Sequence, residues 1–263
     1  MKKIAIAFVA LALFVVTSAR AKASTYTAFE ATTATKKEAS VTLKASATFV
    51  VSNLDDLVVT LSNTGTYDPR NRADILTGVF FKLAGDQHLT PLSATVASDN
   101  SVIGHRLPYF DGNVGGEWAY TNNLKYPSAS IDDCNEGISS TKLKWFKKKD
   151  LFLTGEKIRG TSPLSGAQFG ITTLNDLPGN DQGGIKNKAL IQTTIVFVFD
   201  NLPSGFTVDD ISGVTFQYGT SIKSGIDIAG EPVIEVPEPN TISLVAVGLL
   251  GAVALTGARV RRR

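Results

Sequence analysis

The sequence predicts an all-β fold, and within that class an antiparallel β-sandwich, with a β-barrel as the alternative. Short segments alternate apolar and polar residues with the period of two that is typical of half-buried strands. These segments are rich in β-branched and aromatic residues, and clusters of Gly, Asn, Asp and Pro separate them. Two amphipathic sheets can bury each other's apolar faces, which favours the sandwich.

The strand segments follow one another along the chain. Ser40–Val51 alternates most strictly, with an apolar residue at every odd position from Val41 to Val51. Four further segments are predicted as strands: Leu57–Leu61, Leu76–Leu83, Ala189–Phe199 and Val214–Tyr218. Residues 104–184 are less regular, so we expect long loops there, and any binding surface is expected on them. The Thr- and Ala-rich segment Ser24–Thr35 is expected to be a poorly ordered end of the mature chain.

The first 23 residues have the three parts of a secretory signal peptide. Lys2 and Lys3 precede an apolar stretch from Ile4 to Val16, and small residues stand at positions 21 and 23. This stretch of about 13 residues is shorter than the ~20 that a membrane-spanning helix needs. We therefore expect export with cleavage after Ala23, which makes residues 24–235 the exported β-rich domain.

Residues 236–263 have the properties of a membrane anchor. The uncharged stretch 241–258 would be about 27 Å long as a helix at ~1.5 Å per residue, nearly the ~30 Å of a hydrocarbon core. The basic residues that follow it are Arg259, Arg261, Arg262 and Arg263. The positive-inside rule places such a cluster in the cytoplasm, so the transmembrane helix would leave the β-rich domain outside.

The same tail carries Pro237, Glu238 and Pro239 directly before the span. In this order of parts it resembles the PEP-CTERM sorting signal of Gram-negative bacteria, over residues 237–263. The resemblance implies processing by an exosortase, a membrane enzyme that recognises and cuts such tails. An ordinary tail anchor behind a proline-rich linker is the alternative, because the prolines would hold the chain extended in either case.

Six internal pieces also look like those of a family of exosortase-dependent surface proteins that has no assigned activity. They are Leu61–Gly65, Ala73–Phe81, Leu89–Ala94, Asn113–Tyr120, Phe169–Ile171 and Ile211–Thr220. The resemblance lies in their order along the chain. It implies a location and a size, and it brings no catalytic residue with it.

The charge of the exported part argues against nucleic acid as a partner. The whole chain has 26 basic and 24 acidic residues, but eight of the bases lie in the two terminal segments. Glu238 also lies in the C-terminal segment, so the remaining 18 bases against 23 acids give a net charge near −5, whereas phosphate binding needs a basic footprint. Cys134 is the single cysteine, so no internal disulfide can form, and we favour a packing role for it over pairing between chains.

Few residues have the spacing of a catalytic or metal site. His88 and His105 do not have the spacing of zinc ligands, and the chain lacks the common nucleophile, zinc-helix and phosphate-loop motifs. Glu136 with Asp132-Asp133, or the pair Asp209-Asp210, would be candidates for a glycosidase, but solvated turns are the favoured interpretation. The best candidate for calcium is a loop cluster of oxygen ligands: Asn175, Asp176, Asn180 and Asp181.

One basic run is a candidate contact for an anionic polysaccharide, because aromatic rings stack on sugar faces and lysines attract carboxylates or sulfates. It is the run 142–149, whose aromatic residues are Trp145 and Phe146 and whose bases are Lys142, Lys144, Lys147, Lys148 and Lys149. The alternative, which we favour, is a solvated strand or hairpin with its rings turned inward and its lysines outward.

These observations predict an exported structural or adhesive protein of the cell surface or extracellular matrix, with neither enzymatic activity nor a cofactor. Its expected partners are the secretion machinery, the exosortase, the membrane through the C-terminal helix and an extracellular polysaccharide. We expect it to stay in the inner membrane until the tail is processed. The alternatives are an envelope carbohydrate-active enzyme and a calcium- or polysaccharide-binding module.

Overall fold

The regular structure of the described residues is almost entirely β-strand. The computed structural model describes residues 26–34, 41–52, 54–85, 88–97, 101–104, 110–122, 124, 134–142, 146, 150–154, 158, 164, 166–177, 184–221 and 226–233. Within these residues the regular elements are 14 strands and three short 3-10 helices, η1 (Arg72–Asp74), η2 (Gly115–Glu117) and η5 (Val208–Asp210). The predicted all-β class is confirmed.

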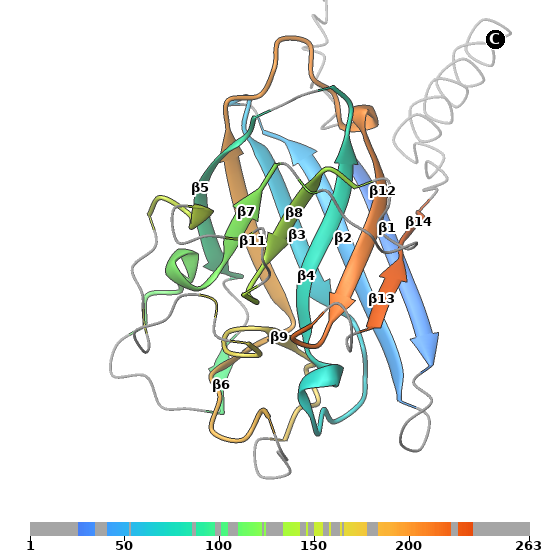
Figure 1. Ribbon diagram of the computed structural model, residues 1–263, viewed down its shortest axis with the longest axis vertical. Coiled ribbons are helices and arrows are strands. Elements are labelled where there is room, and N and C mark those ends of the chain that lie inside the picture. Colours follow the sequence, from blue (N-terminus) through green and yellow to red (C-terminus); the bar gives the residue numbers. More distant parts are fainter. Residues whose placement is uncertain are drawn as a thin grey trace, which may run out of the picture.

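The strands form two sheets (Figure 1). The first sheet has six antiparallel strands in the order β14-β1-β2-β3-β11-β5. Their bounds are β14 (Glu231–Pro232), β1 (Tyr26–Ala34), β2 (Thr42–Val51), β3 (Leu57–Asn63), β11 (Thr194–Asp200) and β5 (Thr90–Val96).

The second sheet has eight strands, with six in the order β13-β12-β4-β9-β10-β6, while β8 pairs with β4 and β7 pairs with β8. Their bounds are β13 (Ile226–Ala229), β12 (Ile211–Tyr218), β4 (Leu76–Leu83), β9 (Ile171–Thr172), β10 (Leu190–Gln192), β6 (Val102–Ile103), β8 (Glu136–Ser139) and β7 (Ala119–Thr121). The pair β9 and β10 is parallel, which departs from the predicted antiparallel arrangement.

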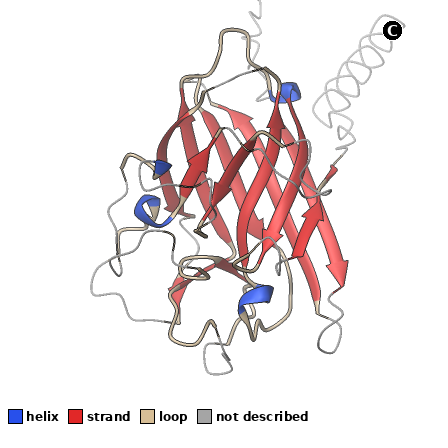
Figure 2. Ribbon diagram, in the orientation of Figure 1, coloured by secondary structure: helices blue, strands red, loops and turns tan. Residues whose placement is uncertain are grey.

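The two sheets lie in separate layers and share one hydrophobic core (Figure 2). Phe49 of the first sheet contacts Phe81 of the second, with ring centroids 5.2 Å apart. Trp118, just before β7, lies 5.2 Å from Phe197 of the first sheet by the same measure. Edge-to-face aromatic pairs of this kind add to the free energy gained from burying the rings.

The strictest sequence pattern gives the most regular strand. In β2 the buried side chains alternate with exposed or half-buried ones, and Leu43, Ala45, Ala47 and Phe49 face the core. The predicted strand Leu76–Leu83 coincides with β4, while β3 and β12 extend the predicted segments by two and three residues. The period of two identified β2 and β3, and the β-branched and aromatic composition identified β4 and β12.

Two predictions about local structure were wrong. Part of Ser24–Thr35, expected to be poorly ordered, forms the nine-residue strand β1, which pairs with β2 along its whole length. The predicted single strand Ala189–Phe199 is divided between the two sheets, into β10 and β11. Between them Thr193 has a φ of 59°, a left-handed conformation that breaks an extended strand.

A second corner joins the sheets at Gly230, between β13 and β14. A Cβ atom on Gly230 would lie 2.9 Å from the Phe216 ring, so only glycine fits without movement. Beyond the corner, Pro232 is opposite Phe29, and the Val233 N–H donates to Ala28 O at 2.8 Å. The first and last strands of the described chain are therefore neighbours at one edge.

Candidate functional site

The residues of the predicted sorting signal lie outside the described residues. These are Pro237, Glu238 and Pro239, the predicted span 241–258, and Arg259, Arg261, Arg262 and Arg263. Within the part of the chain that the structure describes, no helix is long and apolar enough to cross a membrane. Three residues separate the last described residue, Val233, from the first proline of the motif. The prediction of a sorting signal therefore stays a prediction.

The basic run is described at two of its positions. Lys142 is exposed, whereas the Phe146 ring is 4 % exposed and packs with Phe80, Leu124 and Cys134. Lys144, Trp145, Lys147, Lys148 and Lys149 lie outside the described residues. Because its ring is buried in this small cluster, Phe146 is not accessible for stacking on a sugar.

Two of the four candidate calcium ligands are described, and both make hydrogen bonds within the protein. The Asn175 amide donates to Thr66 O at 2.8 Å, and the buried Asp176 carboxylate accepts a hydrogen bond from the Thr172 hydroxyl. Asn180 and Asp181 lie outside the described residues. Among the described residues no group of three or more His, Cys, Asp or Glu side chains is arranged to hold a metal ion.

The remaining candidates have ordinary structural settings. His88 is exposed beside Asn122, and His105 is not among the described residues. The Cys134 thiol is buried and donates to Gly213 O at 2.8 Å, which agrees with the packing role. Asp210 caps the 3-10 helix η5 by accepting the Thr207 N–H at 2.9 Å.

Glu136 is a carboxyl group whose burial the sequence did not predict. It was expected in a solvated turn, but it begins strand β8 and is 1 % exposed. Its cross-strand partner is Phe81, and Ile138 follows on the same face, so the Glu136 side chain points into the core between the sheets. The prediction was wrong because pairing with the distant strand β4 buries this residue.

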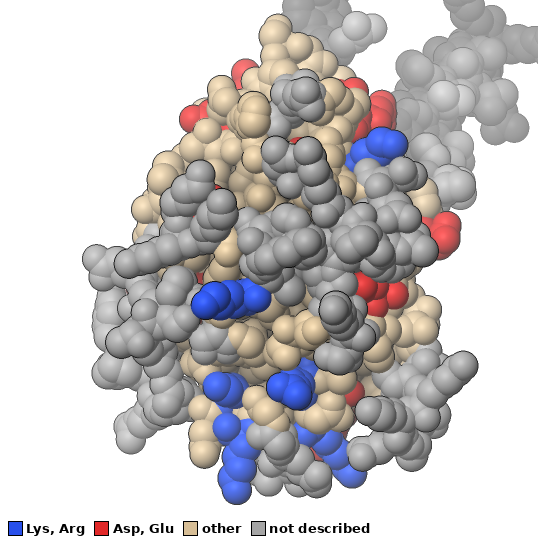
Figure 3. Space-filling model, viewed as in Figure 1, with Lys and Arg blue, Asp and Glu red and all other residues tan. Residues whose placement is uncertain are grey.

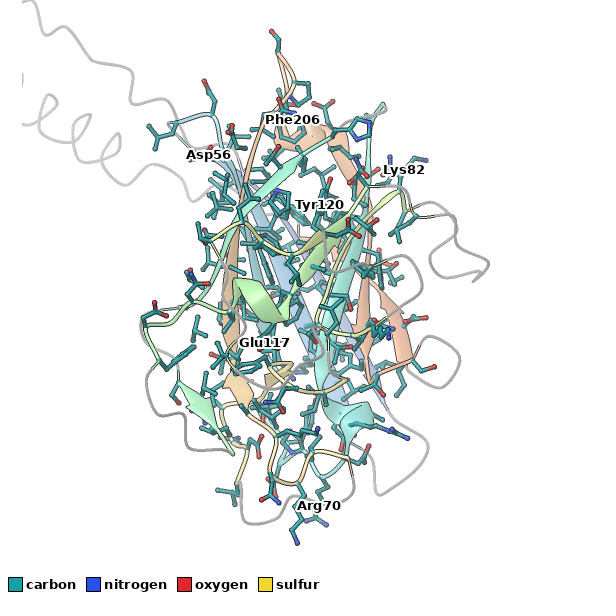
Figure 4. The ribbon with its side chains drawn as sticks, turned by 60° about the vertical axis from the view of Figure 1, so that its left-hand side comes forward. Asp56, Arg70, Lys82, Glu117, Tyr120 and Phe206 are labelled. Atoms are coloured by element: carbon teal, nitrogen blue, oxygen red, sulfur yellow. The ribbon has the colours of Figure 1, made fainter. Side chains whose placement is uncertain are left out.

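The Tyr120 hydroxyl is the hydrogen-bond partner of this carboxyl group. It donates to Glu136 Oε2, and its ring packs edge-to-face on Phe199 at a centroid distance of 4.9 Å. Figure 4 shows Tyr120 inside the molecule, toward the end that carries Asp56 and Phe206. Glu136 Oε1 is also buried, and among the described residues it has no hydrogen-bond partner.

Burial changes the acidity of both groups. It raises the pKa of the Glu136 carboxyl from 4.5 to about 7, and the hydrogen bond from Tyr120 opposes this rise without cancelling it. Burial, with the charge of Glu136, raises the pKa of the Tyr120 hydroxyl above its usual range. A carboxyl group with a pKa near 7 can exchange a proton at neutral pH.

A row of polar side chains crosses the opposite face of the same sheet. Asp227, Gln217, Gly78 and Ser139 are successive neighbours on β13, β12, β4 and β8. A Cβ atom on Gly78 would lie 3.3 Å from both Gln217 Oε1 and Ser139 Oγ, so the missing side chain makes room for the Gln217 amide. This amide is fully buried, and among the described residues neither of its polar atoms has a hydrogen-bond partner.

Asp227 at the end of this row is the second carboxyl group with a raised pKa. Burial raises its pKa from 3.8 to about 6. Phe216, Tyr218 and Ile228 occupy the core face of their strands, so by alternation Asp227 and Gln217 lie on the outer face. Asp227 and Glu136 are therefore on opposite faces of one sheet, and they cannot flank a single substrate bond.

Comparisons with protein-family models, with curated proteins and with solved structures give no match to this chain.

Proposed function

We propose that this chain is an exported, non-catalytic structural or adhesive protein of the bacterial surface, and that its β-rich domain is an antiparallel sandwich. A signal peptide directs export, and a C-terminal helix holds the domain in the inner membrane until an exosortase removes the tail. The domain then resides on the cell surface or in extracellular matrix.

The observation that carries this proposal is the position of the terminal segments relative to the folded strands. The strands extend from Tyr26 to Pro232, so both proposed signals fall outside the sheets. The chain leaves β14 beside the first strand, and four residues separate the end of β14 from the Pro-Glu-Pro motif. A processing enzyme would therefore reach the motif without unfolding the core.

The placement of the acidic groups supports a non-catalytic role. A glycosidase needs two carboxyl groups about 5–9.5 Å apart on either side of one glycosidic bond. The two described carboxyl groups with raised pKa, Glu136 and Asp227, are on opposite faces of a sheet. This arrangement favours the structural role over the alternative of a carbohydrate-active enzyme.

The two corners support the sandwich. At Thr193 and at Gly230 the chain passes from one sheet to the other, and the residues on each side of the corners pack into one core. The same corners also occur in barrels, where strands bend from one wall to the next. The two separate strand orders favour the sandwich over the barrel.

Fractionation of cells with and without the exosortase, followed by intact mass measurement, tests the proposal. The expected product in the presence of the enzyme begins near Ser24 and ends near Pro239. Without the enzyme the mass should extend to Arg263, and the protein should stay in the membrane fraction. A full-length chain that is soluble in the cytosol would refute the proposal.

Alanine at Pro237 and Pro239 should reproduce the result of enzyme deletion, whereas Pro203→Ala, in a loop of the folded domain, should not.

A further inference from the structure

The two ends of the folded domain present opposite charges. At one end the exposed or half-buried bases are Arg70, Arg72, Lys186 and Lys188, which we name the basic end. At the other end the exposed or half-buried acids are Asp55, Asp56, Asp200, Asp209 and Asp210, which we name the acidic end. Figure 3 shows blue side chains gathered at the lower end and red ones at the upper end, and Figure 4 labels Arg70 and Asp56 at these opposite ends.

Packing of two loops gathers the four bases. Ile185 is fully buried against Ile75, which directly follows η1. The aliphatic part of Arg72 covers Gly184, where a Cβ atom would lie 3.1 Å from Arg72 Cδ. The turn that carries Lys186 and Lys188 is thereby held beside the helix that carries Arg72.

The acidic side chains near the basic end accept hydrogen bonds from backbone N–H groups. The buried Asp74 carboxylate accepts the N–H groups of Arg70 and Asn71, both at 3.1 Å. Asp68 accepts the Leu177 N–H at 2.9 Å. Among the described residues, the exposed charged side chains at this end are therefore the bases Arg70, Arg72 and Lys186.

The acidic end is built from the turns at the other tips of the strands. Asp55 and Asp56 lie in the turn between β2 and β3, and Asp200 ends β11. Asp209 and Asp210 belong to η5, whose Asp210 O accepts the Ala84 N–H at 3.1 Å. Lys82 is the basic residue that Figure 4 labels near this end.

The separation of the two ends prevents them from neutralising each other within one molecule. Strand β2 has ten residues and connects the two ends, which at ~3.3 Å per residue gives about 30 Å. This distance is several times the ~8 Å screening length at physiological salt. A second copy, in contrast, can bring its acidic end directly against the basic end of the first.

We propose that copies of this chain associate end to end, the basic end of one against the acidic end of the next. Such a contact joins two different surfaces, so it repeats along an open chain unless its rotation closes a ring. The proposal deepens the proposed structural role, because it supplies a way to assemble matrix. The chain leaves β14 beside Ala28, whose partner Thr48 lies in the half of β2 nearer the acidic end.

Charge reversal of each end, followed by mixing, tests the contact. The full chain is studied by sedimentation velocity in one non-ionic detergent, at about 20 mM and about 0.5 M NaCl, because salt screens exposed charges. The wild type should increase in average mass with concentration at low salt and be monomeric at high salt. The variants Arg70→Glu/Lys186→Glu and Asp56→Lys/Asp209→Lys should each be monomeric, and an equal mixture of the two should associate again.

A matched control leaves both ends unchanged and changes the net charge as the single substitution Arg70→Glu does. The variant Lys142→Glu should associate as the wild type does, Arg70→Glu should associate less, and circular dichroism should show that all variants are folded. A wild type that is monomeric at low salt, or a mixture that stays monomeric, would overturn the proposal. Binding of the basic end to alginate or to anionic lipid vesicles without self-association would overturn it as well, in favour of another polyanion. Tail processing is not measured here, so a negative result leaves the proposed export and sorting intact.

Discussion

The free energy of unfolding of the wild type should fall as the pH rises through the titration of Glu136. Replacing Glu136 by Gln should remove most of this fall. The pKa of this carboxyl is about 7 in the folded chain and 4.5 in the absence of burial. Between these values the unfolded chain releases the proton while the folded chain keeps it, so the free energy of unfolding falls with rising pH. Below about pH 4.5 both states are protonated and the stability is at its full value.

The size of the effect follows from the shift. At about 1.4 kcal/mol per pH unit, a rise from 4.5 to about 7 corresponds to about 3 kcal/mol. Gln keeps the shape of the side chain and an oxygen that can accept the Tyr120 hydrogen bond, but it does not titrate. Above pH 7 the variant should therefore be more stable than the wild type by an amount of this order.

Urea denaturation at pH steps across this window, followed by tryptophan fluorescence, measures the effect. Asp227 also titrates with a raised pKa, so both proteins should carry Asp227→Asn, which leaves Glu136 as the difference. Tyr120→Phe removes the hydrogen bond that lowers the pKa of Glu136, and it should move the upper limit of the window to higher pH. Parallel pH profiles of the proteins with and without the Glu136→Gln substitution would refute the reasoning.

Three further substitutions test the packing, each through the urea midpoint. Gly230→Ala should cost about 1–3 kcal/mol, because its Cβ would stand 2.9 Å from the Phe216 ring at the corner between the sheets; an unchanged midpoint would show that the corner can relax. Phe49→Ala should cost about 3–5 kcal/mol, because a fully buried ring between the two sheets is lost. Asn175→Ala should cost about 1 kcal/mol through the lost hydrogen bond to Thr66, and a larger loss with calcium present than without it would indicate a metal at this loop.

The sequence predicted those strands in which the local order of apolar and polar residues determines which side chains are buried. In β2 and β3 the alternation of the residues predicts which side chains face the core. It did not predict the break at Thr193, because the residues on both sides continue the apolar pattern while the chain changes sheet. Strand β1 was missed because its small Thr and Ala side chains carry a weak hydrophobic signal, and pairing with β2 fixes its conformation.

The candidate site was less predictable than the fold. Glu136 is buried by pairing with β4, more than 50 residues earlier in the chain, and no local pattern records such a pairing. Gln217 and Ser139 become near neighbours only because Gly78 of a third strand lies between them. Asp176 was predicted only as a candidate calcium ligand, and its contact with Thr172 depends on a turn that composition does not specify.

The pairing of β14 with β1 determines how the domain would respond to mechanical load. A pull on the tail reaches first the hydrogen bond from Val233 to Ala28 and the two-residue pairing behind it. A strand this short can peel away while β1 stays joined to β2 through nine residue pairs. Under force applied to the C-terminal segment, β14 would therefore detach first and lengthen the chain by a few residues. The strands that form the aromatic core would stay folded at that force.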